Sequence, residues 1–196
     1  MLRWSLRQCC AAAALALCGA AGCATVPAQT DIERRSLARS VISRWTDPAQ
    51  LLALRLMEEH GLPDRIELDR LTWQERGGWK RVVVSARTPC REGGGPDELL
   101  EQAVDYAVPV GAEDGLAALG GRVRVSRDGL ELSACSASEK LNRLALNLAV
   151  DIAREERDPR DVPLFYDRAA RLSAAGKSSP YMERLLFVPA AVQPAR

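Results

Sequence analysis

The sequence is poorest in histidine, because His60 is the only one among 196 residues. One imidazole excludes metal sites that need several histidines and removes most triads in which a histidine is the base. An excess of charge is also missing, because 27 lysines and arginines face 26 aspartates and glutamates, a formal net charge of +1. A chain with this balance has no strongly basic composition, so we expect no nucleic-acid partner.

Long apolar runs are also missing, except near the N-terminus. Met1–Gln8 is short and positively charged, Cys9–Ala20 is almost entirely apolar, and small residues then lead to Cys23. This layout is typical of a signal peptide, and its apolar part is too short for a comfortable transmembrane helix. The sequence therefore predicts export from the cytoplasm.

The residues Ala20-Ala21-Gly22-Cys23 resemble a lipobox, the motif at which bacterial lipoprotein precursors are lipidated on cysteine and cleaved. Ala20 departs from the commoner leucine. The resemblance implies a covalent lipid with acyl chains such as palmitate on Cys23, and Ala24 in place of an aspartate implies an outer-membrane location facing the periplasm. The alternatives are a plain secretory signal cut nearby and an uncleaved anchor. The expected organisation is a signal peptide, a lipidated tether and a single domain: 1–22, 23–30 and 31–196.

Three of the six cysteines fall in the predicted signal peptide: Cys9, Cys10 and Cys18. With Cys23 assigned to the lipid, Cys90 and Cys135 remain as a pair in an oxidising compartment, which predicts a disulfide. We expect it to join the sheet to the helix layer and to stabilise the fold by about 4 kcal/mol in the chain-entropy model. The alternative is a pair of buried free thiols.

Apolar residues at helical spacing alternate along the chain with short β-branched runs. Helices are predicted over 31–45, 47–61, 113–119, from a Ser136/Glu139 capping box onward, and over 162–176. Strands are predicted over 66–74, 79–86, 100–108 and on both sides of Asp128-Gly129, with a bulge or bend near Asp69. Strands segregated from helices predict the α+β class, with an antiparallel sheet of about five strands and helices packed on one face.

Three short motifs carry a resemblance beyond the signal: Gly61-Leu62-Pro63, Leu71-Thr72-Trp73 and Trp79-Lys80-Arg81. They resemble a family of uncharacterised exported bacterial proteins that share a Gly-x-Pro after a helix, a Leu-x-Trp strand and a Trp-Lys-Arg strand. That likeness covers most of the mature chain and implies no activity. A helix ending in Gly-x-Pro before a tryptophan-bearing hairpin is also similar, over a short stretch, to small accessory lipoproteins of the outer-membrane barrel-assembly machinery, which implies a binding module.

Two sets of residues are candidates for a binding surface. Trp73, Trp79 and Tyr106 lie on predicted strands and suit a recognition groove, with core packing as the alternative. A basic patch facing anionic lipid is the second candidate, with a solvated sheet face as its alternative. The patch consists of Lys80, Arg81, Arg122, Arg124 and Arg127.

Residues that suit catalysis are few. Glu58-Glu59-His60 lacks the second histidine of a metalloprotease motif, so we expect His60 to be solvated at a helix end and predict no metal site. Carboxylate pairs that suit acid–base chemistry also arise on ordinary charged surfaces, and we assign them no catalytic role. These pairs are Asp97/Glu98 and Asp151/Glu155.

The sequence as a whole favours a membrane-tethered, non-catalytic domain that binds a protein partner in the cell envelope and uses no cofactor besides the lipid on Cys23. One alternative is an envelope hydrolase that uses carboxylates. Another is a lipid or glycan carrier, for which a deep apolar pocket between helices and sheet is expected.

Overall fold

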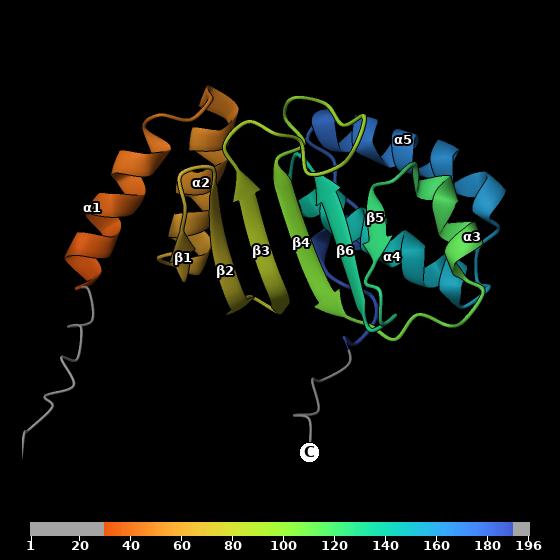
Figure 1. Cartoon of the computed structure of the whole chain (residues 1–196). Helices are drawn as coiled ribbons and strands as arrows, with labels where there is room; N and C mark the ends of the chain where they lie inside the picture. The colour runs from red at the N-terminus through yellow and green to blue at the C-terminus, as the bar shows by residue number, and fades with distance from the viewer. Residues whose placement is uncertain (1–29, 190–196) are drawn as a thin grey trace, which may run out of the picture.

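Figure 1 shows the computed structural model of the chain, which describes residues 30–189. The predicted signal peptide, Cys23 and the tether as far as residue 29 lie outside the described residues, as do residues 190–196. Within 30–189, no helix is both long enough and apolar enough to cross a membrane.

Strands and helices are segregated along the chain, as predicted for the α+β class. The helices are α1 Asp31–Ile42, α2 Asp47–His60, α3 Glu113–Leu116, α4 Glu139–Ala153, α5 Val162–Ala174 and α6 Pro180–Glu183, with 3-10 turns η1 Ala117–Leu119 and η2 Pro159–Asp161. The strands are β1 Arg65–Ile66, β2 Arg70–Arg76, β3 Trp79–Ser85, β4 Leu100–Asp105, β5 Val123–Val125 and β6 Glu131–Ser136. They form one antiparallel sheet in the order β1-β2-β3-β4-β6-β5.

Helices cover one face of this sheet, which confirms the predicted architecture. Figure 1 shows α2 and α4 behind the sheet and no helix in front of it. Side chains alternate between the two faces of a strand, so every second one points into the space between the sheet and the helices. The inward strand residues are Leu71, Trp73, Val82, Val84, Leu100, Val104, Leu132 and Ala134, all fully buried. Leu56 of α2 and Leu148 of α4 complete this core from the helix side.

The sheet has one strand more than the sequence indicated, because the run over 66–74 is divided in two. The bend expected near Asp69 is a chain reversal, so that Arg65 of β1 pairs with Thr72 of β2. Two long-range hydrogen bonds hold the turn: Trp45 Nε1 donates to Leu68 O at 2.9 Å, and Ala86 N donates to Asp69 O at 2.8 Å. Both donors lie far from the turn in sequence, so local pattern does not reveal them.

The start of α4 differs from the predicted capping box. Its N-cap is Ser138, which accepts a hydrogen bond from the backbone, whereas Ser136 still belongs to β6 and is buried. Ser136 Oγ donates to Asn142 Oδ1 at 2.7 Å, and Asn142 Nδ2 donates to Leu100 O at 3.2 Å and to Gln102 Oε1 at 3.0 Å. A buried polar network therefore joins the first turn of α4 to β4 and β6.

The segment after Gly176, for which the sequence pattern predicts no element, is held by one buried side chain of α4. Asn147 Nδ2 donates to Tyr181 O and Arg184 O, both at 2.9 Å, and Asn147 Oδ1 accepts from Leu186 N at 2.7 Å. Phe187 then packs edge-on against Tyr106 with ring centroids 5.4 Å apart. The C-terminal part of the described chain is thus fixed to the helix layer.

The structure contains the predicted disulfide between Cys90 and Cys135, with Cα atoms 5.7 Å apart. Its position differs from the expectation of a link to the helix layer. Cys135 is one residue from the inward-facing Ala134, and it pairs with the outward-facing Glu101 of β4. The bond therefore fixes the β3–β4 loop to the uncovered face of the sheet.

Reduction of this disulfide should destabilise the domain without unfolding it. The two cysteines are 45 residues apart, and a loop of that length corresponds to about 4 kcal/mol of stability in the chain-entropy model. Urea denaturation with and without reductant measures the change. The double variant Cys90→Ser, Cys135→Ser should match the reduced wild type and be insensitive to reductant; identical midpoints for oxidised and reduced wild type would contradict the expectation.

Candidate functional site

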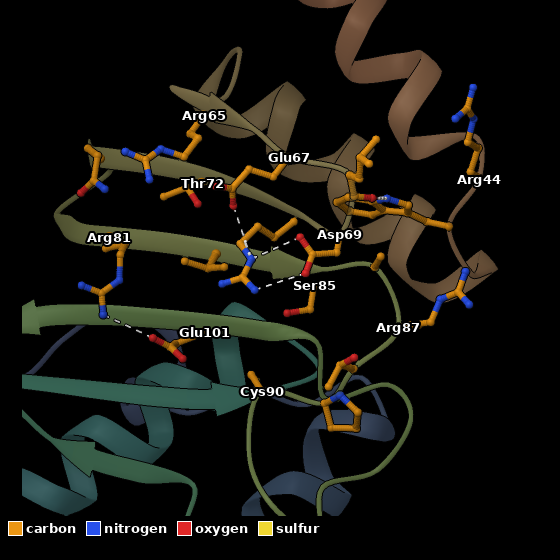
Figure 2. Close-up of a pocket in the computed structure, with 18 of the residues that line it drawn as sticks. Arg44, Arg65, Glu67, Asp69, Thr72, Arg81, Ser85, Arg87, Cys90 and Glu101 are labelled. Atoms are coloured by element: carbon orange, nitrogen blue, oxygen red, sulfur yellow. Dashed lines mark hydrogen bonds and ion pairs between the residues drawn. The ribbon is translucent and has the colours of Figure 1, made fainter.

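A groove of about 810 Å³ lies on the uncovered face of the sheet. Its floor is made by outward residues of β2 and β3, such as Thr72 and Val83. One wall is the β1–β2 turn, and another is the start of the β3–β4 loop up to Cys90, which the disulfide fixes in place (Figure 2). Secondary structure and a covalent bond therefore position the lining residues.

Positive charge dominates the lining of the groove. Three carboxylates contribute to it: Glu67, Asp69 and Glu101. Twice as many guanidinium groups do so: Arg44, Arg65, Arg70, Arg81, Arg87 and Arg124. The carboxylates are all paired with three of these arginines. Arg70 lies 3.2 Å from Asp69 and 3.4 Å from Glu67, whereas Arg81 lies 3.3 Å from Glu101, which also contacts Arg124.

Three groove arginines remain without such a partner. Arg44, Arg65 and Arg87 are exposed, and no carboxylate of residues 30–189 lies within 4.0 Å of their guanidinium nitrogens. Arg44 and Arg87 lie at one end of the groove, and Arg65 lies toward the other (Figure 2). Local sequence pattern does not reveal this set, because its members come from the α1–α2 connection, β1 and the β3–β4 loop, and only the fold brings them to one face.

The predicted basic patch does not form as a free cationic surface, because four of its five members have other partners. The fifth, Arg127, is exposed in the turn between β5 and β6. Lys80 lies 2.6 Å from Asp105 and 3.1 Å from Glu131, and Arg81 lies 2.7 Å from Glu131. Arg122 is on the helix side, where its guanidinium stacks 4.6 Å from the ring centroid of Tyr166. Lys80, Arg81 and Arg124 therefore fit the alternative interpretation, a solvated sheet face, on which they form ion pairs.

The aromatic residues predicted for a recognition groove are in other places. Trp73 is 0% exposed and donates from Nε1 to Gly61 O at 2.9 Å, and Trp79 is 2% exposed. Tyr106 is half-buried against Phe187. The two tryptophans therefore belong to the core, as the alternative interpretation had it, and none of the three aromatics lines the groove.

One carboxylate of each pair considered for catalysis has structural contacts. Glu98 lies 2.6 Å from Arg91 and accepts a hydrogen bond from Gly95 N, so it organises the β3–β4 loop. Asp151 accepts from Tyr181 Oη at 2.6 Å and lies 3.2 Å from Arg157. These contacts join the end of α4 to the C-terminal segment, so they give Asp151 a structural role.

His60 is not solvated, contrary to the prediction. Its side chain is 8% exposed, and its Nε2 lies 3.5 Å from Glu139 Oε2. Burial arises because the ring packs against the β2–β3 turn, where a Cβ at Gly77 would lie 2.9 Å from His60 Cε1. Glu59, His60 and Glu139 are the one group within residues 30–189 that brings three potential metal-ligating side chains together.

Comparisons with protein-family models, with curated proteins and with solved structures gave no match to the chain. The interpretation of its sites therefore rests on the residues and on their geometry.

Glu131 provides a test of the ion pairs beside the groove. Burial favours its neutral form, but hydrogen bonds from Arg81 and Lys80 outweigh burial and hold the pKa of Glu131 below its ordinary value of 4.5. A lowered folded-state pKa contributes stability that is present above the unfolded pKa and lost as the pH falls through the folded value.

We therefore expect Glu131→Gln to lower the free energy of unfolding by about 1–2 kcal/mol at neutral pH. The variant should also lose less stability than wild type as the pH falls from about 5 to about 3. Urea titrations across this range measure both effects. Glu92→Gln, which changes an exposed carboxylate, is the control; parallel pH profiles for wild type and Glu131→Gln would contradict the expectation.

Proposed function

We propose that the protein is a lipid-anchored binding module of the bacterial cell envelope, and that its groove receives an acidic segment of a partner protein. The observation that carries the proposal is the groove on the uncovered sheet face, in which six arginines accompany three carboxylates. No catalytic step and no cofactor is part of the proposal.

The charge of the groove supports an acidic occupant. Arg44, Arg65 and Arg87 are fully charged at any physiological pH and have no carboxylate partner among the described residues. A guanidinium binds a carboxylate with two parallel hydrogen bonds, which gives both attraction and orientation. Aspartates and glutamates of an extended segment would therefore give these guanidinium groups ionic partners.

The shape of the site supports a protein segment over a flat membrane surface and over strand addition. The groove is concave, and walls from the β1–β2 turn and the β3–β4 loop limit access to a narrow occupant. The sheet edges β1 and β5 have two and three residues, which is too short to pair firmly with a partner strand. Recognition through side chains in the groove is the mode that remains best supported.

The proposed location rests on the lipobox-like residues ending at Cys23 and on the disulfide. An intramolecular disulfide is typical of exported proteins and rare in the reducing cytosol. The local resemblance to accessory lipoproteins of the barrel-assembly machinery supports the same class of function. In this proposal the tether holds the domain at the outer membrane with the groove in the periplasm.

The two alternative functions receive less support. Of the four carboxylates suggested for a hydrolase, Glu98 holds the β3–β4 loop and Asp151 holds the C-terminal segment. A carrier would need a deep apolar cavity between helices and sheet, but the large apolar side chains in the centre of that layer are fully buried. They include Trp73, Leu100, Leu132, Leu144 and Leu148.

Photo-crosslinking in intact cells tests the proposed partner. A crosslinking amino acid in place of Gln74, an exposed groove residue, should capture one envelope protein through a peptide rich in aspartate or glutamate. The groove variant, defined as Arg44→Gln, Arg65→Gln, Arg87→Gln, should lower the yield of that crosslink by about tenfold, because it removes the unpaired charges. Mass spectrometry identifies the captured peptide and measures the yield.

The matched control removes three equally exposed positive charges from the helix side. This helix variant is defined as Arg154→Gln, Arg168→Gln, Arg171→Gln, and it should crosslink as wild type does. Capture of lipid, capture of a peptide without acidic character, or equal loss in both variants would overturn the proposal.

Cys23→Ser tests the anchor separately. If Cys23 carries the lipid, the variant should lose the mass of the acyl groups and move from the membrane fraction to the soluble fraction. Cys90→Ser, which changes a cysteine of the disulfide, should remain acylated and membrane-bound. A wild-type chain whose intact mass shows no acylation would contradict the anchor, whatever the crosslinking experiment shows.

A further inference from the structure

The C-terminal end of α2 and the N-terminal end of α4 bring a nitrogen and two oxygen donors together. Glu59 and His60 end α2, and Glu139 begins α4. One ligand atom of each side chain lies within 4.8 Å of those of the other two. The three residues come from two segments of the chain about eighty residues apart, so no local sequence motif marks them.

The imidazole of His60 is the unusual member of this cluster. Its side chain is more than nine-tenths buried, and its Nε2 makes no hydrogen bond within the described part of the chain. A buried polar atom without a partner costs roughly 1–3 kcal/mol. Nε2 lies 3.5 Å from Glu139 Oε2, a separation that exceeds a normal hydrogen bond.

The carboxylate of Glu139 is already oriented by its neighbours. Gln102 Nε2 donates to Glu139 Oε2 at 3.1 Å, and Arg143 donates to Glu139 Oε1. Gln102 is in turn fixed by Asn142, whose Nδ2 donates to Gln102 Oε1 at 3.0 Å. Outer contacts of this kind fix the ligands of metal sites in position.

We infer that Glu59, His60 and Glu139 form a binding site for a divalent cation of the zinc class. The ion would accept the lone pair of His60 Nε2 and would thereby give this buried atom a partner. An imidazole ligand selects zinc-like ions over Mg²⁺ and Ca²⁺, which prefer oxygen ligands alone. Glu59 and Glu139 supply two anionic oxygen donors, of which the guanidinium of Arg143 contacts one, and such donors favour a cation.

The surroundings of the cluster leave room for a further ligand. A hollow of about 360 Å³ between α2 and α4 reaches Glu59 and Glu139, and its apolar wall includes Leu52, Leu56 and Leu100. A zinc ion with three protein ligands keeps one position open for water or a small ligand. Arg55 and Lys140 also line the hollow; both are exposed, as Glu59 is, so water screens the charges of all three.

Zinc titration of the purified protein, as the cell processes it and without a histidine tag, tests the inference. Because the chain has one histidine, a single imidazole gives the ring resonances in an NMR spectrum. Zn²⁺ should shift these resonances and raise the melting temperature at a stoichiometry of one, whereas Mg²⁺ should do neither. Calorimetry gives the dissociation constant.

Ligand variants separate a metal site from a simple ion pair. His60→Ala and Glu59→Gln should each weaken zinc binding by about tenfold or more, and the neighbouring exposed carboxylate provides the control Glu58→Gln, which should bind as wild type does. Wild type without zinc-dependent shifts, or zinc binding retained by His60→Ala, would overturn the inference.

A pair of glycine variants checks the geometry without changing a ligand. Gly77 and Gly78 both have positive φ, at +60° and +85°, so alanine introduces backbone strain at either position. Only at Gly77 would the new Cβ lie 2.9 Å from His60 Cε1. Gly77→Ala should therefore weaken zinc binding and Gly78→Ala should not; equal affinity in both would contradict the proposed position of the ring.

Discussion

Burial of one face of the sheet against α2 and α4 is the interaction on which the rest of the structure depends. Trp73, Leu100 and Leu148 are 0% exposed in this layer, and each large apolar side chain buried in this way contributes roughly 1.5–3 kcal/mol. Most inward positions of the strands are apolar and most outward positions are polar or charged, because side chains alternate between the two faces. The groove and its neighbouring ion pairs are consequences of that alternation.

The uncovered face combines a neutralised part with a positively charged part. Lys80 and Arg81 are balanced by Asp105 and Glu131 on the central strands. The arginines that β1, the α1–α2 connection and the β3–β4 loop bring to the groove are not balanced in this way. The disulfide holds the β3–β4 loop on this face, which makes the groove a persistent feature of the surface and suits it to recognise a partner without rearrangement.

Local pattern was sufficient to predict the α+β class, the one-sided helix layer and the Cys90–Cys135 bond, because each depends on periodicity or on residue type. It failed where a distant residue decides the outcome. The β1–β2 turn depends on Trp45, which donates to Leu68 O across 23 residues. His60 looked like a solvated helix end because nothing nearby in sequence shows that Glu139 and the β2–β3 turn cover it. The groove arginines follow no spacing rule at all.

Calorimetric titration of the purified protein with a short glutamate-rich peptide measures the proposed recognition most directly. The account predicts a dissociation constant that rises with salt and is about tenfold higher for the groove variant, while the helix variant binds as wild type does. Equal affinity of the two variants, or tighter binding of a lysine-rich peptide of the same length, would contradict the account.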